Sequence, residues 1–452
     1  MHRRIVVLRP HEWLKEAFAK RAFALAAPRL ETTIAVKGVR FDERYHPVRV
    51  RGRLAVSGER PAAIGFDYAK ATTLESFCLR TDFEDEEAIA RFARDRATEV
   101  VGVYADPEVR AFPSPYCGAN AIGDATDVAR QLGVAGLKKL GLTGKNVRVA
   151  IVDTGLDGRH AASDGHRLRI VGGWSPIPGY APGSTSPPQH GTMCAFDTTI
   201  AAPDAKLLDY ALLQSSGDTF NAFLSDAIAA YASLMELLDD DPRPLVVNNS
   251  WGMYDRSQDE PVGSPGNYSA NPDHPFNQMV GSLVAAGADV FFAAGNCGAD
   301  CPAGACGARD VGPGRSIHGA NSHPDVITVA AVTVTRRRLG YSSQGPGGLY
   351  QRKPDVAAYS QFTGSGVYPN DNGTSAASPV AAGLAAALRQ KLGRTKLTPA
   401  QLKGLLQRTA TDLGGTGWDY DFGYGVVNAT RALKGLGLGP AKAKRRRPAT
   451  RR

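Results

Sequence analysis

Five short, mostly apolar runs rich in β-branched residues recur along the chain, and helical stretches lie between them. Runs of this kind are typical of strands that are buried on both faces of a parallel sheet. Strands that alternate with helices indicate an α/β fold, in which ligands bind beyond the carboxyl ends of the strands. The sequence therefore predicts a mainly parallel sheet with helices on both faces. The expected strands are 147–152, 206–210, 245–249, 290–294 and 326–332.

Helical periodicity predicts helices over 86–96, 127–140, 220–238 and 275–288. Thr81, Asp82, Phe83 and Glu84 have the residue types of a capping box, which would open the first of these helices. A run over 99–104 predicts a further strand before it reaches Asp106-Pro107.

Composition divides the 452 residues into four parts. Residues 1–112 mix short strand-like and helical pieces and predict a small α+β domain. Residues 113–124 contain two prolines and two glycines and predict a linker. Residues 125–434 carry the predicted parallel sheet. Residues 435–452 are rich in Gly, Ala, Pro and basic residues, which predicts a disordered basic tail.

The net charge of +9 is concentrated at the carboxyl end. Residues 434–452 hold eight Lys and Arg and no acidic residue, so the rest of the chain carries 9 − 8 = +1. We therefore expect no nucleic-acid binding by the body of the protein. For the tail, two interpretations stay open: a solvated segment, or contacts with anionic surfaces. The contacts would come from Lys442, Lys444, Arg445, Arg446 and Arg447.

The amino terminus does not match a signal peptide. Its apolar run, Ile5 to Leu8, is shorter than the usual apolar core of about 7–15 residues. Nor does any stretch reach the ~18 apolar residues of a membrane span. The location is unknown from sequence. The default expectation is the cytoplasm, with secretion by another route as the alternative.

Three short motifs lie where ligands are expected. Asp153-Thr154-Gly155 follows a predicted strand, and His190-Gly191-Thr192 follows a loop rich in Pro, Gly and Ser. Gly373-Thr374-Ser375 precedes an apolar helix of small residues. Singly, each has a structural interpretation as a cap, a turn or a packed residue. An aspartic protease would need a second carboxylate motif, and none with a matching context is present.

Together, the motifs resemble the signatures of the subtilisin-like serine proteases, the subtilases. The order Asp, His, Ser is the order of that family, and the spacings of 37 and 185 residues suit it. The strand-like segment 292–296, which ends in Gly-Asn, also matches, and the resemblance covers about residues 125–434. It implies a serine endopeptidase that acts on proteins or peptides through Asp153, His190 and Ser375. It further implies that Asn296 stabilises the oxyanion. The substrate-binding residues implied are Ser250, Trp251, Gly252, Ala293, Ala294 and Gly295.

The chemistry accounts for these residue types. A serine hydroxyl is a weak nucleophile, so His190 must accept its proton. Asp153 would accept a hydrogen bond from the other imidazole nitrogen, fix the tautomer and stabilise the imidazolium. Attack on a peptide carbonyl forms an oxyanion, which the Asn296 amide and the Ser375 N–H would stabilise. The alternative is a catalytically silent subtilase-fold protein that binds peptides or protein partners.

The resemblance carries further expectations. Residues 1–112 resemble, more weakly, a propeptide that would act as an intramolecular inhibitor in a self-processed zymogen. The alternative is an accessory or partner-binding domain. No cofactor is required, and structural calcium is compatible with the family, although no site is assigned. Ala376 stands where a Met often follows the nucleophile, and Trp251 occupies a position that is often Leu. His160 resembles a structural histidine of the family rather than the base.

Six cysteines are too few for a disulfide scaffold in a chain of this length. Cys297, Cys301 and Cys306 cluster directly after Asn296. Three states stay open for them: a disulfide, free thiols, or a metal site with His318 as a fourth ligand. Cys194, which follows the His motif, is interpreted as a small buried apolar residue, with a reactive thiol as the minor alternative.

Overall fold

The computed structural model describes residues 1–34, 36–52, 74–111, 120–216 and 219–438. A parallel sheet lies at its centre, with the strand order β16-β15-β14-β12-β7-β9-β8. Its seven strands are β7 (Arg148–Asp153), β8 (Ile170–Trp174), β9 (Lys206–Ala211), β12 (Leu245–Asn249), β14 (Asp289–Ala293), β15 (Ile327–Val332) and β16 (Val356–Tyr359). The predicted α/β fold is confirmed, and each of the five predicted strands begins and ends within one residue of its expected bounds. The two outermost strands, β8 and β16, were not predicted.

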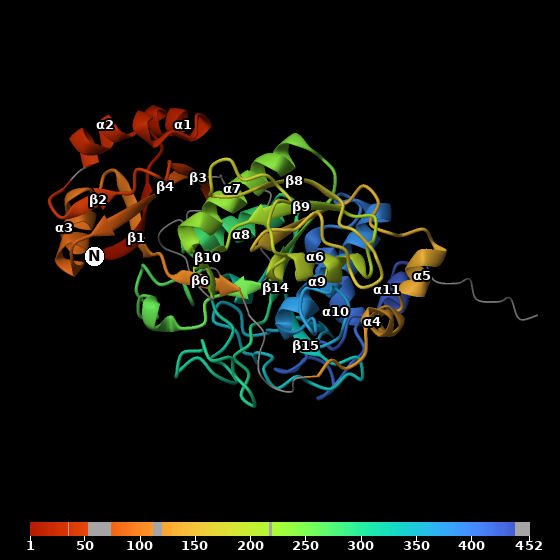
Figure 1. The fold of residues 1–452 in the computed structure, drawn as a ribbon. Helices are drawn as coiled ribbons and strands as arrows, with labels where there is room; N and C mark the ends of the chain where they lie inside the picture. The colour runs from red at the N-terminus through yellow and green to blue at the C-terminus, as the bar shows by residue number, and fades with distance from the viewer. Residues whose placement is uncertain (35, 53–73, 112–119, 217–218, 439–452) are drawn as a thin grey trace, which may run out of the picture.

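Alternating side chains of the sheet enter two separate cores. In β7, Val149 and Ile151 face one core, and Ala150 and Val152 face the other. Helices cover both faces, as Figure 1 shows. On one face lie α4 (Ala125–Leu132), α5 (Val134–Lys139), α6 (His190–Thr199), α9 (Gly373–Leu392), α10 (Pro399–Thr409) and α11 (Ala429–Gly435). On the other lie α7 (Leu224–Asp240) and α8 (Pro275–Ala285).

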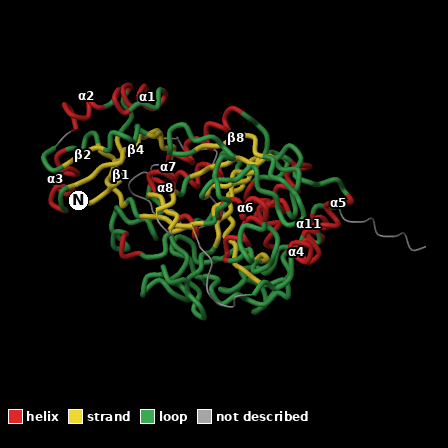
Figure 2. The backbone as a smooth tube through the Cα atoms, viewed as in Figure 1, coloured by secondary structure: helices red, strands yellow, loops and turns green. Residues whose placement is uncertain are grey.

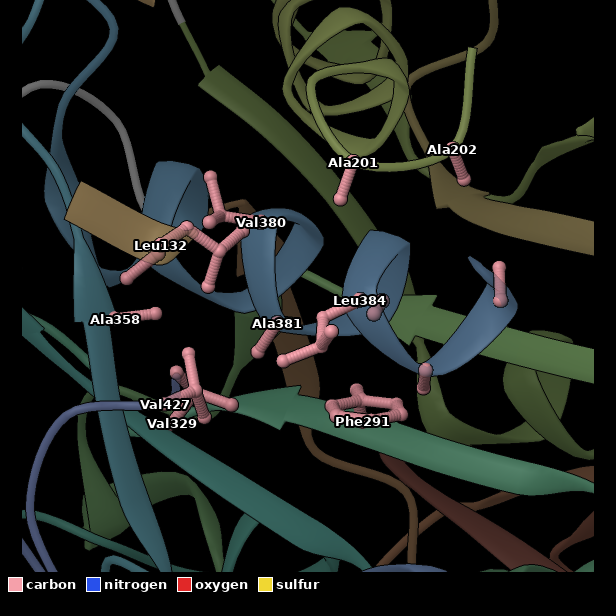
Figure 3. Packing of buried hydrophobic residues seen from close by; sticks show 14 of the residues in the cluster. Leu132, Ala201, Ala202, Phe291, Val329, Ala358, Val380, Ala381, Leu384 and Val427 are labelled. Carbon is pink, nitrogen blue, oxygen red and sulfur yellow. The ribbon is translucent and has the colours of Figure 1, made fainter. Parts of the chain in front are cut away.

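Helix α9 occupies the middle of the first core. Its small residues allow it to lie close to the sheet, and Gly383 leaves no room for a side chain against the carbonyl of Thr198. In Figure 3, Ala381 and Leu384 of this helix lie over Phe291 of β14. A helix fixed on all sides in this way gives its amino-terminal turn a defined position.

The N-terminal region is a separate antiparallel sheet with the order β2-β4-β1-β5 and with β3 paired to β4. Its strands are β1 (His2–Leu8), β2 (Val39–Phe41), β3 (Val48–Gly52), β4 (Leu74–Phe83) and β5 (Val100–Ala105). Its helices are α1 (Glu12–Ala19), α2 (Ala27–Arg29) and α3 (Glu86–Asp95), with short η1 (Phe23–Leu25) and η2 (Leu30–Ile34) turns. One face packs against these helices. The other shares a core with α7 and α8, beside which the region lies in Figures 1 and 2.

A third sheet joins the N-terminal region to the body. Its order is β10-β11-β6-β13, and all its pairs are antiparallel. The strands are β10 (Gln214–Ser216), β11 (Thr219–Phe223), β6 (Glu108–Ala111) and β13 (Trp251–Gly252). Strand β6, which follows the N-terminal sheet, therefore lies between two strands of the body.

Several expected boundaries differ from the structure. The capping-box prediction is wrong: residues 81–83 belong to β4, and Asp85 caps α3 by accepting a hydrogen bond from Ala88 N. The helix expected over 127–140 is two helices, α4 and α5, because Gly133 adopts a left-handed conformation with φ of 87°. Leu436 and Leu438 pack against the main core, so the ordered body extends four residues into the expected tail. Residues 439–452, like much of the expected linker, lie outside the described residues.

None of the described helices is both long and apolar enough to cross a membrane.

Candidate active site

Asp153 and His190 meet at the carboxyl edge of the parallel sheet. Asp153 is the last residue of β7, and His190 is the first residue of α6. The His190 Nδ1 atom lies 2.8 Å from Asp153 Oδ1, which also accepts a hydrogen bond from Thr154 N at 2.7 Å. Both residues are buried: the exposed fraction is 0% for Asp153 and 4% for His190. The carboxylate thus fixes the orientation of the imidazole ring.

Ser375 lies in the first turn of α9. It is far from Asp153 and His190 in sequence but lies near them in the fold. The buried sulfur of Cys194 marks the point where the three residues meet. Its Sγ lies 3.8 Å from Asp153 Oδ2, 3.9 Å from His190 Nδ1 and 3.5 Å from the Ser375 carbonyl oxygen. Burial, followed by the charge of Asp153, raises the pKa of Cys194 well above its usual value. The thiol therefore stays protonated and packs as a small apolar group, in agreement with the sequence interpretation.

Hydrogen bonds from β12 and the residue that follows it hold the start of α9. Ser250 Oγ donates to the Ser375 carbonyl oxygen at 3.1 Å, and Ser378 Oγ donates to Asn248 Oδ1 at 2.7 Å. The Ser375 hydroxyl lies 3.5 Å from the Ser250 carbonyl oxygen. Within the described part of the chain, His190 Nε2 has no hydrogen-bond partner. This nitrogen is therefore available to accept a proton.

Asn296 is oriented by the residue before Ser375. Its Oδ1 accepts hydrogen bonds from Thr374 N at 2.9 Å and from Thr374 Oγ1 at 3.0 Å. A backbone N–H can only donate, so the oxygen of the amide must face Thr374. The Nδ2 group then points elsewhere, is fully buried, and has no partner among the described residues. A buried amide donor without a partner among the described residues, held by the residue before Ser375, could donate a hydrogen bond to an oxyanion.

The substrate-binding residues implied by the resemblance form two neighbouring segments. Trp251 and Gly252 form β13, and Ser250 directly precedes them. Ala293 is the last residue of β14, and Ala294 and Gly295 follow it. The Trp251 side chain does not enter the space between them, because it packs in the core at ring-centroid distances of 5.8 Å from Phe276 and 5.5 Å from Phe292. Its backbone instead pairs with Ala111 of β6. Trp251 therefore presents its main chain to β6, while its side chain belongs to the core.

Asn321, which sequence reasoning missed, joins the two segments. Its Nδ2 donates to the Trp251 carbonyl oxygen at 2.8 Å and to the Ala293 carbonyl oxygen at 2.9 Å. The residue lies in the short η4 helix (Gly319–Ser322), where no motif marks it. One buried amide thus sets the spacing of the two segments.

The cysteine cluster is oxidised, which decides among the three open states. Cys297 and Cys306 form a disulfide, and Cys301 is disulfide-bonded as well. His318, considered as a fourth metal ligand, instead lies 3.4 Å from Asp310. The disulfide closes the loop that begins directly after Asn296, and Ala303 N of this loop donates to the Asn296 carbonyl oxygen at 2.8 Å.

His160 does not contact the base. Its Nε2 lies 2.9 Å from the Ser365 carbonyl oxygen, which fits the structural role expected for it. Ala376, the residue after Ser375, is fully buried and part of the α9 core. Among the described residues, Asp153, His190 and Cys194 are the one group with the spacing of a metal site. Their contacts are those of an Asp-His pair with a protonated thiol beside it. Structural calcium stays an expectation from the family resemblance, with no site assigned.

Two buried carboxyl groups connect α6 to the segment before Ser375. Asp197, seven residues after His190, hydrogen-bonds Asp371, which also accepts a hydrogen bond from Ser365 N at 2.7 Å. Burial raises the pKa of Asp371 to about 6 and that of Asp197 well above its usual range, and the proximity of the two carboxyls raises the Asp197 pKa further. The pair is therefore stable when Asp197 keeps its proton.

Replacing Asp197 by Asn should weaken the pH dependence of stability. At pH values above about 3.9, the ordinary pKa of Asp, these two carboxyls bind more protons in the folded wild type than in its unfolded state. The free energy of unfolding should therefore fall as pH rises through about 4 to 6 and beyond. Asp197→Asn keeps a neutral hydrogen-bonding group and removes one of these titrations. Melting curves at pH 5, 7 and 9 should show a smaller decline for Asp197→Asn than for the wild type, with exposed Asp240→Asn as the control. Parallel declines for all three proteins would contradict the assignment.

Comparison with known proteins gives consistent results. A sequence model described as the subtilase family matches residues 144–425, more than half of the chain. Subtilisin DY of Bacillus licheniformis is 31% identical over 303 residues, which are 65% of this chain and 93% of that protein. Fervidolysin of Fervidobacterium pennivorans is 28% identical over 367 residues, or 73% of this chain.

The match spans 47% of fervidolysin, so the chain corresponds to about half the length of that relative. The crystal structure of fervidolysin, described as a keratinolytic enzyme related to subtilisin, superimposes with a TM-score of 0.59 at 18% identity. The superposition covers 98% of this chain and 61% of that one. At this identity the structural likeness concerns the fold.

Proposed function

Because the chain belongs to the subtilase family of serine endopeptidases, we propose that it hydrolyses peptide bonds in proteins or peptides and that its N-terminal domain is an intramolecular inhibitor. Ser375 is the nucleophile, His190 the general base, and Asp153 the residue that orients the base. The Asn296 amide and the Ser375 N–H form the oxyanion hole. The observation that carries the catalytic proposal is the buried Asn296 Nδ2, which has no partner among the described residues and belongs to an amide that Thr374, the residue before Ser375, holds in place.

Strand β6 supports the inhibitor role. Arg110 and Ala111 pair antiparallel with Gly252 and Trp251, while Asn221 of β11 pairs with Arg110 from the other side. Extended peptides bind many proteins by adding a strand to a sheet edge in this way. A substrate would need the same edge of β13, so the N-terminal segment and a substrate compete for one place.

Polar contacts fix the N-terminal domain at the start of α7. Asp106 accepts hydrogen bonds from Ser225 N at 2.8 Å and from Ser225 Oγ at 2.7 Å. Arg80 donates to Ser225 Oγ at 2.7 Å and to Asp226 Oδ1 at 2.5 Å. Tyr45 donates to the Ser225 carbonyl oxygen at 2.7 Å. A carboxylate from one domain thus caps a helix of the other, which favours a docked domain over a loosely tethered one.

A fluorophosphonate probe tests the catalytic proposal, because it labels an activated serine. We expect labelling of the active wild-type protein at Ser375 and none of Ser375→Ala. A folded wild-type protein that stays unlabelled after its N-terminal domain is removed would instead support a catalytically silent binding protein.

The inhibitor role predicts self-processing. The active wild-type chain should be cleaved between residues 105 and 125, whereas Ser375→Ala should keep its full mass, because cleavage needs the nucleophile. Intact-mass measurement of both proteins after identical purification checks this. A wild-type protein that is fully active and uncut would favour the accessory-domain interpretation.

A further inference from the structure

We propose that Tyr254 is a substrate-binding residue whose hydroxyl donates a hydrogen bond to a main-chain carbonyl of the substrate, upstream of the scissile bond. The inference rests on the proposed function, in which a substrate takes the place of β6. Sequence reasoning assigned no role to Tyr254, which follows the implied substrate segment by two residues.

The contact that carries the inference joins Tyr254 to the docked strand. Tyr254 Oη lies 3.4 Å from the carbonyl oxygen of Ala111, the residue that pairs with Trp251. Asn296 Nδ2 has no partner within the described residues, so the Ala111 carbonyl is not the group in the oxyanion hole. From Arg110 to Ala111, β6 runs from Gly252 to Trp251 and therefore toward Ser250, which contacts Ser375. The Ala111 carbonyl thus corresponds to a carbonyl before the scissile one. Because every residue has a main-chain carbonyl, the bond would hold substrates of varied sequence.

The ring of Tyr254 is held in place by the loop that follows the oxyanion residue. It packs in a small cluster with Ala293, Cys297 and Ala303, with Ala305 and Cys306 at the edge. Its carbonyl oxygen accepts a hydrogen bond from Gly307 N at 3.0 Å. The Cys297–Cys306 disulfide lies within this cluster. One closed loop therefore supports both Asn296 and the phenol ring. Because the ring is already held in place, it loses little conformational entropy when a substrate binds.

The hydroxyl remains a donor at high pH. Burial raises the pKa of Tyr254 well above its usual value. A phenol that stays neutral can donate to a carbonyl at any pH at which the protein is folded.

The test compares two substrates with the processed enzyme. One is a peptide anilide with four residues before the scissile bond, and the other is a single-residue ester with a free amino group, which has no carbonyl upstream of the scissile one. Tyr254→Phe should lower kcat/KM for the long substrate about 5- to 10-fold, the size expected for one hydrogen bond. The loss should lie mainly in KM, because the bond forms equally in the ground state and the transition state. For the ester, kcat/KM should change less than about twofold. Exposed Tyr420→Phe serves as the matched control.

A second measurement identifies the carbonyl. Replacing oxygen by sulfur at each upstream carbonyl of the long substrate in turn weakens one acceptor at a time. At one position, the sulfur substitution should weaken binding to the wild type but should not weaken binding to Tyr254→Phe. This difference would show that the hydroxyl and that carbonyl are coupled. Equal losses on both substrates, or coupling at no position, would overturn the inference while the enzyme remains active. Inactivity of the wild type on both substrates would contradict the proposed function itself, and the inference with it.

Discussion

Replacing Ser375 by Ala should abolish peptide hydrolysis and leave the fold intact. The expected loss in kcat is about 10⁶-fold, a size known for the nucleophile of subtilisin and therefore carried over from a relative. The packing that positions this residue comes from its backbone, since its carbonyl oxygen accepts hydrogen bonds from Ser250 Oγ and Cys194 Sγ. Loss of the hydroxyl removes the nucleophile without removing these bonds. Steady-state kinetics on the peptide anilide, with a melting curve, checks both parts.

Ser378→Ala is the matched control for that experiment. Ser378 is buried one turn further along α9, and its hydroxyl donates to Asn248. Its loss leaves a buried acceptor unpaired and should cost about 1–3 kcal/mol of stability, with far less effect on kcat. Hydrolysis by Ser375→Ala at the wild-type rate, or equal losses of activity in both variants, would remove Ser375 from its role.

Replacing Asn296 by Ala should lower kcat about 10²–10³-fold and leave KM nearly unchanged. The Nδ2 group, which has no partner among the described residues, should bind the developing oxyanion more tightly than the ground-state carbonyl, so its loss is a loss of differential binding. The magnitude is that measured for a subtilisin asparagine, again a relative. Asn296→Asp should be at least as damaging, because it places a carboxylate where negative charge forms.

The structure adds a second effect of the Asn296 change. The Ala variant leaves the buried Thr374 N–H without the Oδ1 acceptor, so it should also lose about 1–3 kcal/mol of stability. Kinetics well below the melting transition separates the two effects. A stable Asn296→Ala variant with near wild-type kcat would show that the residue only supports the loop after it.

Sequence patterns located the inner strands well because a strand buried on both faces is mostly apolar. Strand β15, Ile327–Val332, is such a case, with Thr328 as its one polar residue. The edge strand β8, Ile170–Trp174, is only half buried and contains Gly172 and Gly173, so it lacks that signal. A capping box was expected at Thr81 because its residue types are right, yet β4 runs through it and α3 starts at Asp85. Pairing with β1 outweighed the local preference there.

Some residues of the site could be predicted from sequence, and others could not. Asp153, His190, Ser375 and Asn296 lie in short motifs at strand ends and helix starts, where local sequence is informative. Asn321 and Tyr254 act through contacts with segments distant in sequence, and no local pattern marks them. The Trp251 side chain could not be placed from sequence either, because a large apolar residue beside a groove can face the groove or the core.

The position of β6 between β11 and β13 has a consequence for the active enzyme in solution. If the proposed self-processing releases that strand, two strand edges face each other with unpaired main-chain groups. Such a slot accepts any extended chain, including an exposed loop of another copy of the same enzyme. Self-digestion should therefore proceed as a second-order process, with a half-life that shortens as the enzyme is concentrated. Storage as the docked, uncut chain would avoid it, because the slot is then already filled.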